Sequence, residues 1–501
     1  MTASNDLHYI TAADALAKFR RRELSPVELM EATIARAEAI EPDVNAFAFT
    51  YYERALEQAK AAEAVYARNP DDARPLEGLP VGLKDEVEIE GEPATMASMA
   101  FKDEIADETT PVAERILDAG GIVHARTTTP EFSCAGFTHS ILNGITRNPW
   151  NLHYAVGGSS GGSGAALAAG TVTLASGSDI GGSIRIPASF NGVVGFKPPY
   201  GRVPVELPFN MDTYCHNGPM ARTVADCALF ENALAGPHPN DHTSLRPKLE
   251  IPAQLEGIEG LRIGFTADMG GWPVDPEVAA NTRDAALALR DAGAVVDEVD
   301  LGVDQQTLTQ AISVHYQTMF AAWISSVADE HADVLTDYAI EFARMTAEEG
   351  KGMTVIDGMV IETEIWKPIG KLFEKYDALI APTSATRGLV AGEGYVGKTL
   401  DVGGTQVKYF DSLLTPLFNL ASRCPVLNVP SGFADNGVPT GVQIVARTFD
   451  DVTAFRVGAA LERVRPFWGG RTPTFVRAPQ SYLACAVTRW QPSRARRRTR
   501  Y

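Results

Sequence analysis

The sequence has 501 residues, with 44 Lys and Arg against 63 Asp and Glu, a net charge of −19, and 45% hydrophobic residues. This composition is typical of a globular protein that buries a large core. The excess of negative charge argues against general binding to nucleic acid or to an anionic membrane, because both need a positively charged surface. We therefore expect neither as a partner.

No targeting, membrane or metal signal stands out. The first 14 residues contain acids and no apolar segment, so no signal peptide is predicted. The uncharged run at 155–178 is filled with Gly and Ser, unlike the apolar stretch that a membrane span needs. No H-E-x-x-H or C-x-x-C motif occurs, and the five cysteines are scattered: Cys134, Cys215, Cys227, Cys424 and Cys485. This pattern favours a cytoplasmic protein without a disulfide framework or a metal site.

The first 70 residues have a helical pattern. Ser25, Pro26 and Glu28 form a capping-box sequence with Pro at the first helical position. A second helix is predicted at 51–66. We therefore expect residues 1–70 to be a helical segment packed on the core.

From about residue 80, short apolar runs alternate with Gly-rich turns and helical stretches. This alternation is typical of an α/β architecture with a largely buried sheet. Strands are predicted at 79–83, 122–123, 172–174, 261–264, 377–382 and 442–445, and helices at 112–117, 165–169 and 276–291. Residues 481–501 are rich in Arg and are predicted to be a disordered tail without a role in chemistry.

Two Gly/Ser loops carry the strongest functional signal. The sequence GGSSGG occupies 157–162, and DIGGSIR occupies 179–185. A flexible linker does not sit between apolar elements, a phosphate-binding loop would end in G-K-[ST], and tight turns explain the glycines better than the serines. Successive glycines instead turn backbone N–H groups toward one point, which predicts an oxyanion hole. Its donors would be Ile180, Gly181, Gly182 and Ser183, with Ser183 as the nucleophile.

A serine nucleophile needs a base, and no histidine lies in a suitable motif. Lys84 ends an apolar strand, and a lysine that is desolvated and placed near other cations loses its proton more easily. His153, beside the first loop, and Cys134, as a nucleophile, are the weaker alternatives. Lys84 is therefore the candidate base.

The segment 157–197, together with GLPVGLKD at 78–85, resembles the amidase-signature family. The similarity extends from about residue 8 to 478 and includes TTTPEF at 127–132, TRNPWN at 146–151, GPMARTV at 218–224, APT at 381–383 and GVPTGVQI at 437–444. The resemblance implies one large α/β/α domain over 71–480, with a mixed, twisted β-sheet covered by helices, and no cofactor.

The resemblance also implies site residues. Ser183 would be the nucleophile, Ser159 the proton relay after a cis peptide bond from Gly158, and Lys84 the base. Supporting hydrogen bonds and an ion pair would come from Ser160, Asp179 and Arg185. Segments that line the cleft in the family align with Ser133, Cys134, Ala135, Gly136 and Met211.

The implied activity is hydrolysis of the C–N bond of a small carboxamide or anilide through an acyl-enzyme, with carbamates and esters reachable by the same chemistry. Such an enzyme would be a monomer or a homodimer. One alternative is the glutaminase subunit of a tRNA-dependent amidotransferase, although those subunits usually have Thr where this chain has Ile180. The other alternative, a non-catalytic scaffold, conflicts with the presence of Lys84, Ser159 and Ser183.

Overall fold

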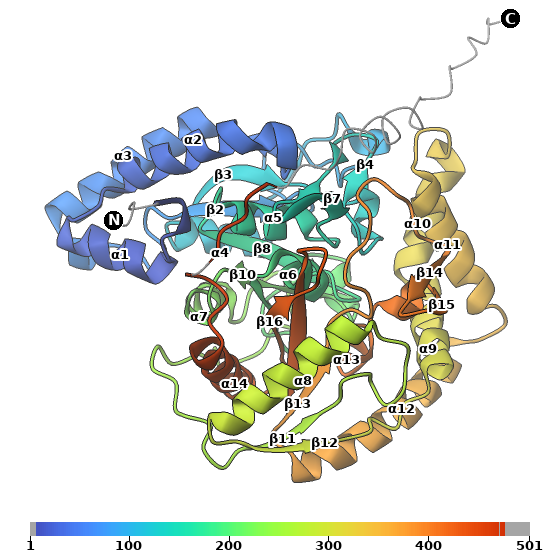
Figure 1. The fold of residues 1–501 in the computed structure, drawn as a ribbon. Helices are drawn as coiled ribbons and strands as arrows, with labels where there is room; N and C mark the ends of the chain where they lie inside the picture. The colour runs from blue at the N-terminus through green and yellow to red at the C-terminus, as the bar shows by residue number, and fades with distance from the viewer. Residues whose placement is uncertain (1–6, 470, 476–501) are drawn as a thin grey trace, which may run out of the picture.

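A large mixed β-sheet runs through the molecule and is covered by helices (Figure 1). The computed structural model describes residues 7–469 and 471–475, so the predicted tail at 481–501 and Cys485 lie outside the described residues. Within the described ranges this sheet has 11 strands. In order of pairing they are β1 (Phe47–Thr50), β3 (Ile122–Thr127), β2 (Pro80–Lys84), β8 (Leu174–Asp179), β10 (His216–Ala221), β9 (Val194–Lys197), β16 (Val426–Phe433), β17 (Pro439–Ala446), β13 (Ala378–Pro382), β11 (Arg262–Phe265) and β12 (Val295–Glu298).

The sheet is parallel at two places and antiparallel elsewhere. Strands β3, β2 and β8 pair in parallel, as do β13, β11 and β12. The strands between these two groups pair antiparallel. The mixed sheet that the resemblance implied is therefore confirmed. Three small hairpins lie outside it: β4 (His139–Ser140) with β5 (Gly144–Ile145), β6 (Arg147–Asn148) with β7 (Asn151–Ala155), and β14 (Thr399–Val402) with β15 (Thr405–Lys408).

Helices cover both faces of the sheet. One face packs against α4 (Pro111–Asp118), α7 (Val224–Leu234), α8 (Pro276–Asp291) and α14 (Asp451–Val464). Toward the other face lie α5 (Gly161–Ala169) and α6 (Arg185–Asn191). The remaining helices are α1 (Ala12–Arg21), α2 (Pro26–Val44), α3 (Tyr52–Arg68), α9 (Gln305–Thr318), α10 (Phe320–His331), α11 (Asp337–Glu349), α12 (Val355–Lys375) and α13 (Leu417–Leu420). Helices α9 to α12 gather on the side of the molecule away from α1 to α3 (Figure 1).

Strand β13 explains why the strands of the sheet have continuous apolar sequences. Ala378 and Ile380 belong to the hydrophobic cluster on one face, whereas Leu379 and Ala381 belong to the cluster on the other. All four side chains are buried. A strand that is buried on both faces shows no polar alternation, and this is the pattern that the sequence displays.

Most of the predicted elements lie where the sequence placed them, and the capping box at Ser25 and Glu28 is present. One strand prediction was wrong: Val172 and Thr173 precede β8, which begins at Leu174 and continues through LASGSD. Gly and Ser are poor strand formers, and pairing with β2 and β10 overrides that preference. The first 70 residues also contain β1, which joins the sheet edge beside β3.

Among the described residues, no helix is both long and apolar enough to cross a membrane.

Candidate active site

The sheet brings the two Gly/Ser loops and the candidate base together. Lys84 is the last residue of β2, and β8 pairs with β2 in parallel, so both strands end at the same edge. The loop after β8 contains Ser183, which lies just before α6. Ser159 lies just before α5, a helix that packs on β2 and β8. Segments about 75 residues apart therefore meet because parallel strands present the same end.

Lys84 is enclosed by three oxygen atoms. Its Nζ lies 2.7 Å from Ser159 Oγ, 2.8 Å from Ser178 Oγ and 3.0 Å from Glu86 Oε1. The side chain is fully buried, and this burial lowers the pKa of Lys84 although the charge of Glu86 opposes the effect. The desolvation expected from the sequence is thus present, whereas the neighbouring charge is an anion and not a cation.

The backbone holds the two serine loops against each other. The peptide bond between Gly158 and Ser159 is cis, as the resemblance implied. The Ser160 N–H donates to the Ser183 carbonyl at 3.1 Å, and the Ser160 hydroxyl bonds the backbone of Ser178. The Ser183 hydroxyl makes no hydrogen bond to a described residue, so its link to Ser159 rests on both serines lining one cavity.

Asp179 and Arg185 form a buried bidentate ion pair beside the nucleophile loop. Arg185 Nε and one terminal nitrogen donate to the two Asp179 oxygens at 2.9 and 2.8 Å. Both side chains are fully buried, and although burial opposes ionisation of Asp179, Arg185 outweighs it and lowers the pKa of the carboxyl. The other Arg185 donors bind Thr415 O, Gln443 Oε1 and Asn419 Oδ1. The geometry agrees with a supporting role for both residues.

The predicted oxyanion donors are not all available. The Gly182 N–H already donates to Asp179 Oδ1 at 2.8 Å, so this member of the predicted set is engaged within the loop. The N–H groups of Ile180, Gly181 and Ser183 have no acceptor among the described residues. Gly182 has φ +118°, and a Cβ there would collide with the Thr415 side chain. Glycine at this position is therefore required by both the backbone and the neighbour.

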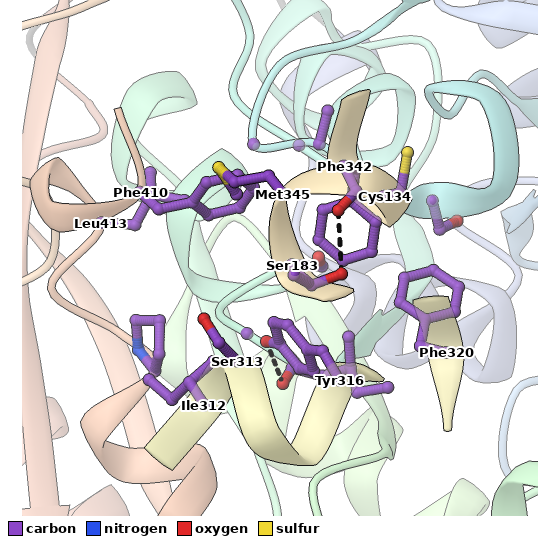
Figure 2. Close-up of a pocket in the computed structure, with 18 of the residues that line it drawn as sticks. Cys134, Ser183, Ile312, Ser313, Tyr316, Phe320, Phe342, Met345, Phe410 and Leu413 are labelled. Carbon is purple, nitrogen blue, oxygen red and sulfur yellow. Dashed lines mark hydrogen bonds between the residues drawn. The ribbon is translucent and has the colours of Figure 1, made fainter. Parts of the chain in front are cut away.

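An apolar cavity of about 690 Å³ adjoins Ser183. Figure 2 shows Tyr316 and Phe320 near Ser183, with Phe342 from α11 above it. Other apolar walls are Ile180, Ile186, Ile312, Met345, Phe410, Leu413 and Pro416. The sequence analysis missed the walls from α9 to α11, because their helical pattern is the same as that of any amphipathic core helix.

A second cavity, of about 1500 Å³, also borders Ser183. Ser159, Ser178 and Ser183 line it. Four carboxylates also line this cavity: Glu86, Glu88, Glu108 and Glu206. Its larger apolar side chains are Met96, Phe132, Leu207, Phe209, Phe320 and Trp323. Ser183 thus lines both the apolar first cavity and the more acidic second cavity.

Four of the five predicted pocket residues line the first cavity: Ser133, Cys134, Ala135 and Gly136. Met211 does not line either cavity; its side chain is 56% exposed at the short helix η5 (Phe209–Met211). Its neighbour Phe209 lines the second cavity instead.

The weaker alternatives gain no support from the geometry. Burial raises the pKa of the Cys134 thiol well above its ordinary value, which disfavours a thiolate nucleophile. His153 lies on β7 and lines neither cavity. Within the described ranges, no group of three or more His, Cys, Asp or Glu side chains is arranged to hold a metal ion.

Comparison with known proteins identifies the family of this chain. The family model for Amidase matches residues 28–455. An acylamidase from Rhodococcus erythropolis is 33% identical over 94% of this chain and 98% of its own length. A glutamyl-tRNA(Gln) amidotransferase subunit from Chloroflexus aggregans is 34% identical over 94% of this chain and 100% of its own. The crystal structure of a bacterial aryl acylamidase superposes with a TM-score of 0.84 at 28% identity, covering 97% of this chain and all of that one.

These matches extend over nearly the whole chain and include the strands and loops that form the site. On this evidence the chain belongs to the amidase-signature family of amide hydrolases.

Proposed function

We propose that this chain hydrolyses the C–N bond of small carboxamides or anilides through an acyl-enzyme on Ser183. The observation that carries the proposal is the 2.7 Å contact between Lys84 Nζ and Ser159 Oγ, in a buried site that also contains Ser183. Full burial lowers the pKa of Lys84 and so favours the neutral form that a base requires. The contact therefore supports a base and relay in place of a histidine.

The proposed reaction proceeds in two halves. Neutral Lys84 takes the proton of Ser159, which takes that of Ser183, and Ser183 Oγ attacks the substrate carbonyl carbon. The N–H groups of Ile180, Gly181 and Ser183 stabilise the oxyanion, and a single such donor is worth about 3–4 kcal/mol. Ser159 then protonates the nitrogen as the C–N bond breaks, and the Lys84 ammonium returns its proton to Ser159. Water reverses these steps, releases the acid and restores the Ser183 hydroxyl.

The two cavities support an assignment of the two ends of the substrate. Ser159 protonates the leaving nitrogen, and this side chain lines the second cavity. We therefore assign the amine to the second cavity and the acyl group to the apolar cavity beside Tyr316 and Phe342. Aromatic or aliphatic acyl groups suit that lining. Carbamates fit the same scheme, because they also present a carbonyl and release an amine.

Amine release from a matched panel tests the proposal. The panel contains primary amides, glutamine, aryl anilides and aryl carbamates, each assayed with the chain and with Ser183→Ala. Release from anilides or primary amides that Ser183→Ala abolishes is the expected result. Equal release by the variant would overturn Ser183 as nucleophile.

The glutaminase role is the second candidate, since an amidotransferase subunit from Chloroflexus aggregans matches this chain over the whole of its own length. It predicts release of ammonia from glutamine, and little from anilides. Turnover of anilides but not of glutamine would exclude it. Silence on the whole panel would favour a scaffold.

A further inference from the structure

Glu86 is a buried carboxylate in contact with the candidate base, and the reaction as described gives it no role. Its side chain is only 10% exposed, and Oε1 lies 3.0 Å from Lys84 Nζ. The Ser133 hydroxyl donates to Oε2, and the Ser178 hydroxyl lies close to the same carboxylate. Burial alone would raise the pKa of Glu86, but Lys84 and the two hydroxyls outweigh it, so the pKa is lowered. Glu86 is thus an anion at neutral pH.

An anionic carboxylate fixes the direction of the neighbouring hydrogen bonds. It can only accept hydrogen bonds, so the nearby Ser178 hydroxyl can donate a proton toward Glu86 but cannot accept one from it. The Ser178 oxygen then accepts an N–H from Lys84, at 2.8 Å. A neutral amine has two N–H groups and one lone pair. One N–H is bonded to Ser178, and Glu86 Oε1 lies 3.0 Å from the nitrogen and attracts the other N–H, which leaves the lone pair for Ser159 Oγ at 2.7 Å.

The charge of Glu86 acts in the same direction. When Lys84 takes the proton of Ser159 it becomes an ammonium in a site without bulk water, which is costly unless an anion is near. Glu86 is the nearest such anion. The other titratable groups whose charge reaches Lys84 or Glu86 from the surrounding elements are Asp179, Cys215, Asp85 and Glu206.

We infer that Glu86 is a positioning residue for Lys84: through Ser178 it directs the lysine lone pair at Ser159, and through its charge it sustains the strength of the base. The inference rests on the proposed function, because it presupposes that Lys84 is the base. It assigns this amidase a carboxylate–lysine–serine–serine chain in place of an isolated lysine.

The test is the pH dependence of kcat/KM for an anilide that the chain turns over. In Glu86→Gln we expect at least about a tenfold loss at the optimum, within the range that acid–base groups contribute. We also expect the acid limb to move to lower pH, because the glutamine no longer holds the lysine proton against desolvation. Glu86→Asp keeps the charge and should recover much of the rate. Ser178→Ala removes the hydroxyl bridge alone, so it should lose rate with little movement of the limb.

Glu206 also titrates nearby, since burial raises its pKa to about 7. Glu206→Gln is therefore profiled in parallel, to identify the part of the curve that belongs to that group. If Glu86→Gln loses rate but the acid limb of its pH profile does not move, Glu86 contributes only packing, and the inference is overturned. If Glu86→Gln does not fold, an unchanged rate in Ser178→Ala overturns it. Full activity in Ser183→Ala and Lys84→Met would instead refute the proposed function itself.

Discussion

The two Gly/Ser loops and the helices α9 to α11 all line the cavities around Ser183, but they are built in opposite ways. The loops at 157–162 and 179–185 are short, buried and held by backbone bonds such as that from the Ser160 N–H to the Ser183 carbonyl. The helices contribute side chains such as Tyr316 and Phe342 from an ordinary packed layer. The candidate catalytic groups are therefore positioned by local backbone geometry, and the walls of the apolar cavity by tertiary packing.

Replacement of Ser183 by Ala is the strongest test that the loops carry the chemistry. Without a nucleophile, we expect amine release to fall by at least about 10³-fold, in line with the loss of a nucleophile in other serine hydrolases. Thermal unfolding should change little, because one oxygen is lost from a side chain that borders a cavity. Ser326→Ala, at an exposed position on α10, is the matched control and should retain full activity. A comparable loss in both variants would indicate a folding defect.

Replacement of Lys84 by Met keeps the length of the side chain and removes the basic nitrogen. The expected loss is about 10²–10⁴-fold, the usual contribution of a general base. In the unmodified chain, activity should fall as the pH drops and Lys84 becomes protonated, and this limb should lie below the ordinary range of lysine because burial lowers its pKa. The measurement is kcat/KM against pH, with the exposed Lys102→Met as control. An acid limb in the ordinary lysine range would contradict the burial argument.

Replacement of Arg185 by Ala tests the support beneath the loops. It leaves the buried Asp179 carboxylate without its counter-ion, which we expect to destabilise the fold by about 3–5 kcal/mol. Scanning calorimetry at a fixed heating rate should show a clear fall in Tm. Arg344→Ala removes an exposed ion pair with Glu341 and should leave Tm almost unchanged. Equal Tm values for the two variants would show that the buried pair has no special weight.

Replacement of Met345 by Ala tests whether the helices determine which acyl groups the site accepts. Met345 lines the apolar cavity from α11, so its truncation should weaken contact with long acyl groups. One methylene in such a pocket is worth about 1–3 kcal/mol, so kcat/KM for long acyl anilides should fall about tenfold or more, while acetanilides change little. Met359→Ala, at an exposed position on α12, is the control. A uniform loss across acyl lengths would place the acyl group elsewhere.

The sequence anticipated the loops well because their signal is local. Ser159, Ser183 and Lys84 are marked by glycines and by an apolar strand, and the sheet brings these three segments to one edge. The error within that set also has a local cause. Gly182 was counted among the oxyanion donors, but its N–H is bonded to the Asp179 side chain, a contact that a linear pattern of glycines does not reveal.

The substrate cavities were much harder to predict. Ile312, Phe342 and Leu413 lie far apart in the chain and meet only through packing, so no spacing in the sequence relates them. Met211 was placed in the pocket by segment alignment, and the turn at η5 points it outward. The sequence does not single out Glu86, two residues after Lys84, because nothing in it reveals that the two side chains lie 3.0 Å apart.

The hydrogen bonds of Arg185 have a consequence for the order in which the protein is made. Three of its acceptors, at Thr415, Asn419 and Gln443, belong to the last fifth of the chain, as does β16, the partner of β9. A nascent polypeptide that stops before residue 415 already carries Lys84, Ser159 and Ser183, yet it lacks the atoms that anchor the nucleophile loop. The hydrogen bonds that hold Arg185 are thus complete only when the last fifth of the chain has been made.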